Sequence, residues 1–188
     1  MIHTSPGLVI AGSVRPNRLA IQISHWVAAV GREAAGLALE VVDLRDWPLP
    51  MDDEPGLPQQ GQYAFEHTRA WSRKIAEAPA FVFVTPQYNG GYPAALKNAI
   101  DHVYGEWAAK PAMIVSYGGH GGGYAAEQLQ QVLQFVHATP LATRPALTLS
   151  REQIQADSGR IDPAAAFCAH LTDLRQAFAE LATALQTA

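Results

Sequence analysis

Short runs of apolar, strand-forming residues recur along this chain, and they alternate with segments in which apolar residues repeat every three or four positions. The apolar runs lie at residues 8–11, 39–42, 81–84, 112–115 and 146–149. Unbroken apolar runs are typical of central parallel strands whose two faces are both covered by helices. We therefore predict a buried strand at each run.

The segments between these runs have the spacing of amphipathic helices. The first apolar stripe consists of Ala20, Ile23, Val27, Val30 and Ala34. Three more stripes lie within residues 64–75, 93–104 and 129–136, and the longest runs from Phe167 to Leu185. Such alternation implies parallel strands joined by right-handed helical crossovers. We expect an α/β fold: a three-layer, flavodoxin-like, doubly wound parallel five-stranded sheet of order 2-1-3-4-5. At 188 residues, residues 1–188 are expected to form a single domain.

The most informative loop follows the third predicted strand. Residues 81–84 lead directly into Thr-Pro-Gln-Tyr-Asn-Gly-Gly-Tyr at 85–92. The proline and the two glycines let the backbone turn sharply and approach a ligand closely, and Tyr88 and Asn89 add planar and polar groups. Pro93 suits the first turn of the helix that follows. The alternative is an ordinary turn before a helix, since these residue types dominate turns.

The loop after the first predicted strand has the features of a phosphate site. It precedes a helix, whose N-terminus offers unpaired N–H groups and a positive dipole end. It adds short donors and positive charge from Ser13, Asn17, Arg15 and Arg18. It matches neither a Walker loop nor the G-x-G-x-x-G of a dinucleotide-binding unit, which disfavours both of those functions. An ordinary helix cap with surface arginines is the alternative.

The loop after the fourth predicted strand, residues 116–123, has five glycines in eight positions. Glycine costs about 0.5–1 kcal/mol of backbone entropy in regular structure, so a ligand or a close packing contact is indicated. His120 could protonate a substrate, although a lone histidine in such a loop is usually a surface group. Three loops thus meet at one edge of the sheet. One suits a phosphate, one suits a flat ring with polar edges, and one lets the backbone approach closely. A mononucleotide with a large flat ring system has these features. FMN meets that description.

Composition narrows the function classes. The chain has a net charge of −4, a pI near 5.9 and no cluster of basic residues. It therefore lacks the positively charged surface that binds nucleic acid. No apolar run reaches the ~18 residues of a membrane span, and the N-terminus does not resemble a signal peptide, so we expect a cytoplasmic protein without membrane insertion. The single cysteine, Cys168, lies in the last helical stripe and is expected to be a small core residue.

One segment departs from the alternation. Residues 46–58 are rich in proline and acid, and predict a long loop that is either ordered or flexible. A metal site at Asp52, Asp53 and Glu54 is disfavoured, because adjacent carboxylates cannot all converge on one ion and no histidine is near in sequence. A solvated loop is favoured, and no metal ligand is expected. Trp47 and Met51 make a contact with a partner subunit plausible.

Taken together, these residues resemble the NADPH-dependent FMN reductase family, a flavodoxin-like group that includes quinone, chromate and azo-dye reductases. The matching motifs span essentially the whole domain: Gly-Ser-Val-Arg at 12–15, the Asp-Leu to Leu-Pro segment at 43–50, Thr-Pro-Gln-Tyr-Asn-Gly at 85–90, Ala-Leu-Lys-Asn-Ala-Ile-Asp at 95–101, and Tyr-Gly-Gly at 117–119.

The resemblance implies an enzyme with FMN as cofactor and NADPH or NADH as electron donor. In a two-step reaction, the flavin would take a hydride and then reduce a quinone-like, azo, flavin or metal-oxyanion acceptor. The flavin performs this chemistry, so no catalytic side chain is assigned. Family members usually form a homodimer or a homotetramer, which implies interface roles for residues 93–104 and 47–58.

The resemblance also implies the cofactor-binding residues. The phosphate would be bound by Ser13, Arg15, Asn17 and Arg18; the ring and ribityl chain by Pro86, Gln87, Tyr88, Asn89 and Gly90; and the other ring edge by Ser116, Tyr117, Gly118 and Gly119. Two positions depart from the common pattern. Many members have Ser or Gly where this chain has Asn17, and Glu where it has Gln87, which keeps the hydrogen-bonding shape but not the charge.

Two other functions fit the same pattern of residues: a flavodoxin-like electron carrier and a flavin-binding module without turnover. Carriers tend to be strongly acidic to meet basic partners, whereas a charge of −4 over 188 residues is mild. This difference favours the enzyme.

Overall fold

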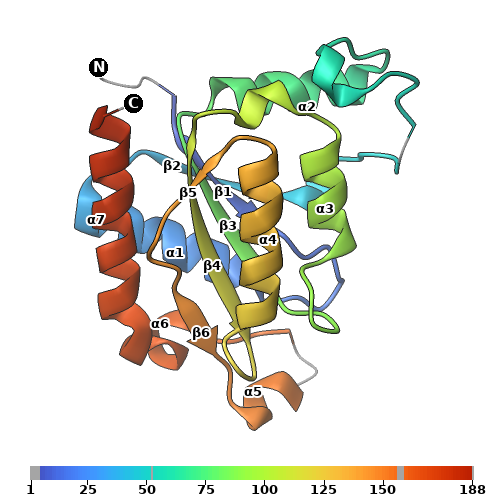
Figure 1. Ribbon diagram of the computed structural model, residues 1–188. Helices are drawn as coiled ribbons and strands as arrows, with labels where there is room; N and C mark the ends of the chain where they lie inside the picture. Colours follow the sequence, from blue (N-terminus) through green and yellow to red (C-terminus); the bar gives the residue numbers. More distant parts are fainter. Residues whose placement is uncertain (1–4, 52, 156–158, 188) are drawn as a thin grey trace.

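The fold is a twisted parallel sheet between two layers of helices (Figure 1). The computed structural model describes residues 5–51, 53–155 and 159–187. The strands β1 (Gly7–Ala11), β2 (Leu39–Asp43), β3 (Phe81–Pro86), β4 (Pro111–Gly118) and β5 (Thr139–Pro140) pair in parallel, in the order β2-β1-β3-β4-β5. The predicted fold class and strand order are confirmed.

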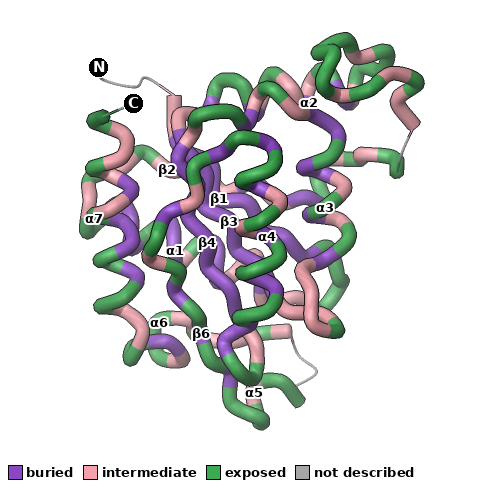
Figure 2. The backbone as a smooth tube through the Cα atoms, viewed as in Figure 1, coloured by how far each residue is buried: buried purple, intermediate pink, exposed green. Residues whose placement is uncertain are grey.

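Alternation along each central strand builds two separate cores. In β3, Phe81 and Phe83 point to one face of the sheet, and Val82 and Val84 point to the other. On the phenylalanine face pack α2 (Glu66–Glu77), α3 (Ala94–Asp101) and α4 (Gly123–Phe135). On the valine face pack α1 (Ala20–Ala35) and α7 (Leu171–Thr187). The buried backbone in Figure 2 follows the sheet and the inner sides of these helices.

The predicted strand at 146–149 is present as β6 (Ala146–Thr148), but it fills only part of the fifth position of the sheet. This position is divided into β5, which pairs with the start of β4, and β6, which pairs with its end. Residues 141–145 connect the two pieces. Proline lacks the N–H that a continuous ladder needs; Pro140 directly precedes this connection, and Pro145 is its last residue. The sheet therefore has five strand positions made from six strands.

The end of the chain also corrects the sequence interpretation. The last helical stripe, predicted from Phe167 to Leu185, begins in a 3-10 turn, η4 (Cys168–His170), and continues in α7; a short helix that was not predicted, α6 (Pro163–Ala166), precedes it. The turn changes the helical phase, so Phe167 is buried while Cys168 is exposed. The expectation that Cys168 is a core residue is wrong. A short helix α5 (Arg151–Gln155) was not predicted.

The proline-rich connection between β2 and α2 is anchored to the helices that it crosses. It contains two short 3-10 turns, η1 (Leu44–Asp46) and η2 (Pro58–Gln60). Another 3-10 turn, η3 (Gly105–Trp107), lies elsewhere, after α3. Trp47 packs edge-on against Trp71 with ring centroids 5.0 Å apart. Asn98 of α3 donates a hydrogen bond to the Leu49 carbonyl. Asp52 lies outside the described residues.

None of the helices in the described part of the chain is both long and apolar enough to cross a bilayer.

Candidate functional site

A cavity of about 410 Å³ opens at the carboxyl edge of the sheet, the lower end in Figure 1. This is where ligands bind in open doubly wound sheets. Predicted residues that line it are Arg15, Asn17, Arg18, Pro86, Gln87, Tyr88, Tyr117, Gly118 and Gly119. The structure thus brings the three predicted loops together around one space.

The first loop leaves the N-terminus of α1 open. Leu19 occupies the N-cap position, and no side chain of the described residues caps the helix. The side-chain cap of the alternative interpretation is thus not seen among them, although Arg15 lies at the surface as that interpretation expected. Within the described part of the chain, N–H groups at the start of α1 have no capping side chain, and both Arg15 and Arg18 line the cavity beside them.

The two arginines of this loop have different surroundings. The Arg18 side chain is largely buried, with 8% of it exposed, and pairs with Asp43 at the end of β2. Its Nε atom is buried and has no hydrogen-bond partner among the described residues. Arg15 is exposed, and its guanidinium lies 3.8 Å from the centre of the Tyr88 ring.

The second loop is a tight turn that positions Tyr88. The backbone N–H of Tyr88 donates to the Gly91 carbonyl at 2.7 Å, and the Gly91 N–H donates back at 3.0 Å. Asn89 and Gly90 between them have φ of 50° and 83°, as in the Asn-Gly turns of hairpins. They lie at the tip and do not line the cavity. Their position indicates that they form the turn.

Ser13 also acts through Tyr88. Its side chain is fully buried and does not line the cavity. The Ser13 and Tyr88 hydroxyl oxygens are 2.6 Å apart and share a hydrogen bond. Ser13 therefore fixes the tyrosine ring, which in turn supports Arg15.

The Gln87 amide is oriented by the N-terminus of α4. Its Oε1 accepts a hydrogen bond from the Tyr124 backbone N–H at 3.1 Å. The Gln87 N–H donates to the Tyr117 carbonyl and ties the second loop to β4. Because Gln87 Oε1 already accepts this hydrogen bond, the Nε2 group of Gln87 is available as a donor at the cavity wall.

The glycines of the third loop divide into two groups. Gly118 and Gly119 line the cavity, whereas Gly121 and Gly122 shape the turn before α4. Gly122 has φ of 78°, and a Cβ there would lie 3.0 Å from the Tyr117 carbonyl oxygen. This position requires glycine for both reasons.

Two further residues of this loop lie outside the cavity lining. Ser116 is buried and donates from its Oγ to the Gly121 carbonyl at 2.7 Å, which holds the turn in place. His120 is exposed. Tyr117 does line the cavity, and burial, followed by the nearby Tyr88, raises the pKa of its hydroxyl well above the ordinary value.

A fourth wall was missed by the sequence interpretation. Residues after β6 close the cavity, together with Leu19: the side chains of Leu149, Gln153 and Ile154 and the backbone of Gly159. Gln22 of α1 clamps this segment, because its Nε2 donates to the Gly159 carbonyl and its Oε1 accepts from the Ile161 N–H. A signal was present, since the fifth strand must end at the same sheet edge.

Comparison with known proteins identifies the family. Residues 7–150 match the family described as NADPH-dependent FMN reductase. The chain belongs to this family. It is accordingly an oxidoreductase with FMN and NAD(P)H as cofactors, as the sequence motifs predicted.

Similar proteins agree with this membership. The chain is 56% identical over 175 residues to an NAD(P)H-dependent FMN reductase of Schizosaccharomyces pombe, covering 92% of this chain and 86% of that protein. It is 30% identical over 165 residues to a quinone reductase of Pseudomonas putida, covering 82% and 83%. The solved structure of FerB, a flavoenzyme NAD(P)H:(acceptor) oxidoreductase of Paracoccus denitrificans, has the same fold, with a TM-score of 0.68, 24% identity and 98% coverage of both chains.

Proposed function

We propose that this FMN reductase family member binds FMN in the cavity at the sheet edge and transfers electrons from NAD(P)H to quinone-like acceptors. The observation that carries the proposal is the convergence of the arginine loop, the Tyr88 turn and the glycine loop on one cavity of about 410 Å³. The similarity to a quinone reductase supports the choice of acceptor.

The first loop fits the phosphate of FMN. The uncapped N-terminus of α1 supplies N–H donors, Arg15 supplies an exposed positive charge, and Asn17 lines the same wall. The buried Nε of Arg18, without a protein partner among the described residues, needs an acceptor. These features support a phosphate group at this wall.

The second and third loops fit a flat heterocycle. Pro86, Gln87 and Tyr88 form one wall, and Tyr117, Gly118 and Gly119 form another. Gln87 supplies an amide donor of fixed orientation, and the two glycines leave the backbone bare. The fourth wall, from Leu149 and Ile154, adds apolar surface that excludes water from one side of the cavity.

When bound, FMN supplies a redox group that takes two electrons as a hydride and passes them to an acceptor. The protein's part is to bind, orient and partly shield this group. Because the cavity is one open space rather than two, donor and acceptor would use it in turn, which corresponds to ping-pong kinetics. No proton-transferring side chain is required.

Steady-state oxidation of NADPH and NADH by the FMN-loaded protein, with 1,4-benzoquinone varied at several donor concentrations, tests this proposal. We expect turnover with parallel double-reciprocal lines. The protein without FMN is the control and should be inactive. Intersecting lines would contradict the alternating use of one site, and absence of turnover with any acceptor would favour an electron carrier.

We also propose that two copies of the chain associate through the outer side of α3 and α4. A groove of about 580 Å³ lies there, lined by residues of α3, α4 and the loop from Trp47 to Pro58. Two large apolar side chains on it are well exposed, Phe135 at 71% and Leu57 at 65%. Exposed apolar surface of this kind marks association sites. A homodimer, or a homotetramer built from two such dimers, would cover it.

A further inference from the structure

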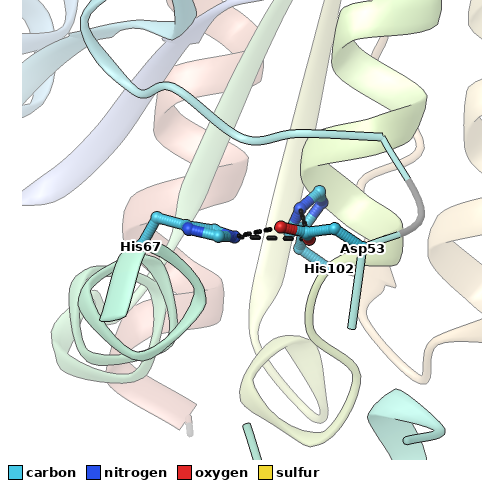
Figure 3. Close-up of side chains that lie close together, drawn as sticks. All are labelled: Asp53, His67 and His102. Carbon is cyan, nitrogen blue, oxygen red and sulfur yellow. Dashed lines mark hydrogen bonds and ion pairs between the residues drawn. The ribbon is translucent and has the colours of Figure 1, made fainter. Parts of the chain in front are cut away.

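Three potential metal ligands meet at the end of α3 that is remote from the flavin cavity. They are Asp53 from the loop before α2, His67 from the first turn of α2 and His102 at the end of α3 (Figure 3). Their ligand atoms all lie within 4.8 Å of one another. Among the described residues, this is the one group of three or more such side chains with that geometry.

The separations suit a single ion. His67 Nε2 lies 3.0 Å from Asp53 Oδ2, and His102 Nε2 lies 3.8 Å from Asp53 Oδ1. Tetrahedral zinc holds nitrogen and oxygen ligands at about 2.0–2.2 Å, which places neighbouring ligand atoms roughly 3.3–3.6 Å apart. Small side-chain movements would therefore bring the three groups onto one ion.

The two ring nitrogens of His102 have different surroundings. Its Nδ1 lies 2.8 Å from the Asn98 carbonyl oxygen. A carbonyl can only accept, so Nδ1 carries the hydrogen, and in a neutral ring Nε2 then bears a lone pair. That Nε2 atom is buried and has no hydrogen-bond partner among the described residues, and only 4% of the side chain is exposed.

The buried lone pair faces a carboxylate oxygen, which also only accepts. The Asp53 side chain is 26% exposed, but the His102 side chain is buried. Two acceptors that face each other in this way repel, unless a proton or a metal ion lies between them. A metal ion between His102 and Asp53 removes the conflict. The hydrogen bond from Nδ1–H to a backbone carbonyl is the support usually found behind metal-bound histidines.

We propose that Asp53, His67 and His102 form a binding site for a divalent transition-metal ion of the zinc class. Two imidazoles and one carboxylate are ligands that suit zinc and exclude magnesium and calcium, which prefer oxygen. A cavity of about 180 Å³ beside Asp53 and His102 has room for a water molecule as a further ligand.

The surroundings hold the three ligands in place. Glu54, next to Asp53, accepts hydrogen bonds from the Ala64 and Phe65 N–H groups just before α2. The Phe65 ring stacks on His67 with centroids 5.5 Å apart and planes inclined by 10°. The ion would therefore join the proline-rich loop to α2 and α3. Its role would be to fix this loop, at a distance from the electron-transfer cavity.

The test uses the FMN-loaded full chain, stripped of metal with a chelator and returned to chelator-free buffer near neutral pH. Zinc is titrated against a chromophoric competitor, and thermal unfolding is followed with and without zinc. We expect one equivalent to bind and the melting temperature to rise, because a ligand of the folded state alone stabilises it. Asp53→Asn and His67→Gln are the test variants, since both positions are partly exposed and tolerate a similar shape.

Each test variant should bind zinc about 100-fold more weakly or worse, because even loss of an outer-shell partner costs roughly 10- to 100-fold. His25→Gln, at an exposed position on α1, is the matched control and should bind like the unmodified protein. The FMN absorbance spectrum of every variant reports an intact fold. Zinc binding that is equal in Asp53→Asn and the unmodified protein, or absent from the latter, would overturn the proposal and leave a protonated His102 as the partner of Asp53.

Discussion

Arg15 and Arg18 lie three residues apart and are both positively charged, but their surroundings in the structure differ. The Arg18 side chain is largely buried, paired with Asp43, and donates from Nη1 to the Arg15 carbonyl. Its charge is thus largely balanced, and it organises the loop. Arg15 is exposed above the Tyr88 ring, so its charge is available to a ligand.

Arg15→Ala should therefore weaken binding of FMN much more than binding of riboflavin, because only FMN has the phosphate. A charge-assisted hydrogen bond contributes about 1.5–3 kcal/mol, which corresponds to roughly 10- to 100-fold in Kd. Fluorescence titration with both ligands measures the difference. Arg175→Ala, which removes an exposed arginine of α7, is the control for the change in net charge. Equal losses for FMN and riboflavin would show that the first loop does not bind the phosphate.

At the residue scale, the sequence indicated the loops of the site better than the contacts of each side chain. Gly118 and Tyr88, predicted to bind the flavin, line the cavity. Ser13 and Ser116, also predicted to bind it, make hydrogen bonds to other protein groups and lie outside the cavity lining. Flavin binding by all four residues stays a prediction. The sequence could not indicate the group at Asp53, because His67 and His102 reach that carboxylate only through the packing of two helices against one loop.

At the scale of elements, the divided fifth strand is held by the last helix. Glu180 of α7 accepts hydrogen bonds from the Ala142 and Thr143 N–H groups, at 2.7 and 3.0 Å, in the connection between β5 and β6. Burial alone would raise the pKa of Glu180, but these hydrogen bonds outweigh it and the pKa lies below its ordinary value. The ionised carboxylate is the stabilising form.

Glu180→Gln should lower the free energy of unfolding at pH 7 by about 1 kcal/mol, a figure reduced from that of a buried charged hydrogen bond because the site is exposed. The folded-state pKa is depressed, so this contribution is fully present above the ordinary value of 4.5 and is lost as the pH falls through the folded-state pKa. Urea unfolding from pH 7 to pH 3 measures it. The difference between the two proteins should shrink below pH 4.5, whereas Glu127→Gln, at an exposed position of α4, should differ little at any pH.

The strands were predictable where apolar residues run without interruption, as in β3 and β4. The alternation of strands and helices indicated a parallel sheet but did not fix the strand order; the flavodoxin-like order 2-1-3-4-5 was the expected arrangement for five strands, and the structure confirms it. The fifth position was predicted only in part, since Thr139 and Pro140 carry no apolar pattern. The short elements after β6, including the cavity wall at Gln153 and Ile154, were missed because they lack both the helical stripe and the glycines that marked the other loops.

For the whole molecule, the exposed groove of α3 and α4 is the feature with the clearest consequence for assembly. It includes Leu57 and Pro58 of the proline-rich loop beside Val132 and Phe135 of α4. The sequence interpretation expected this loop and the helix at 93–104 to share an interface. Their joint lining of one apolar groove supports that expectation.

Phe135→Glu should convert a dimer to a monomer, because it places a charge at the centre of an apolar contact that must lose its water. Light scattering after size-exclusion chromatography measures the mass. Gln134→Glu adds the same charge at the neighbouring exposed position of α4 and should leave the mass unchanged. A monomeric unmodified protein at micromolar concentration would refute this assembly.

The broken fifth strand has a consequence beyond topology. β5 and β6 form one edge of the sheet, and the outermost strand of any open sheet offers unpaired backbone groups to other chains. Here that border consists of two very short pieces, with Pro140 in one and Pro145 directly before the other. A strand from a second molecule would therefore find no continuous row of backbone N–H and C=O groups with which to pair. The interruption that left β5 unpredicted thus also disfavours aggregation of the folded protein through this edge of its sheet.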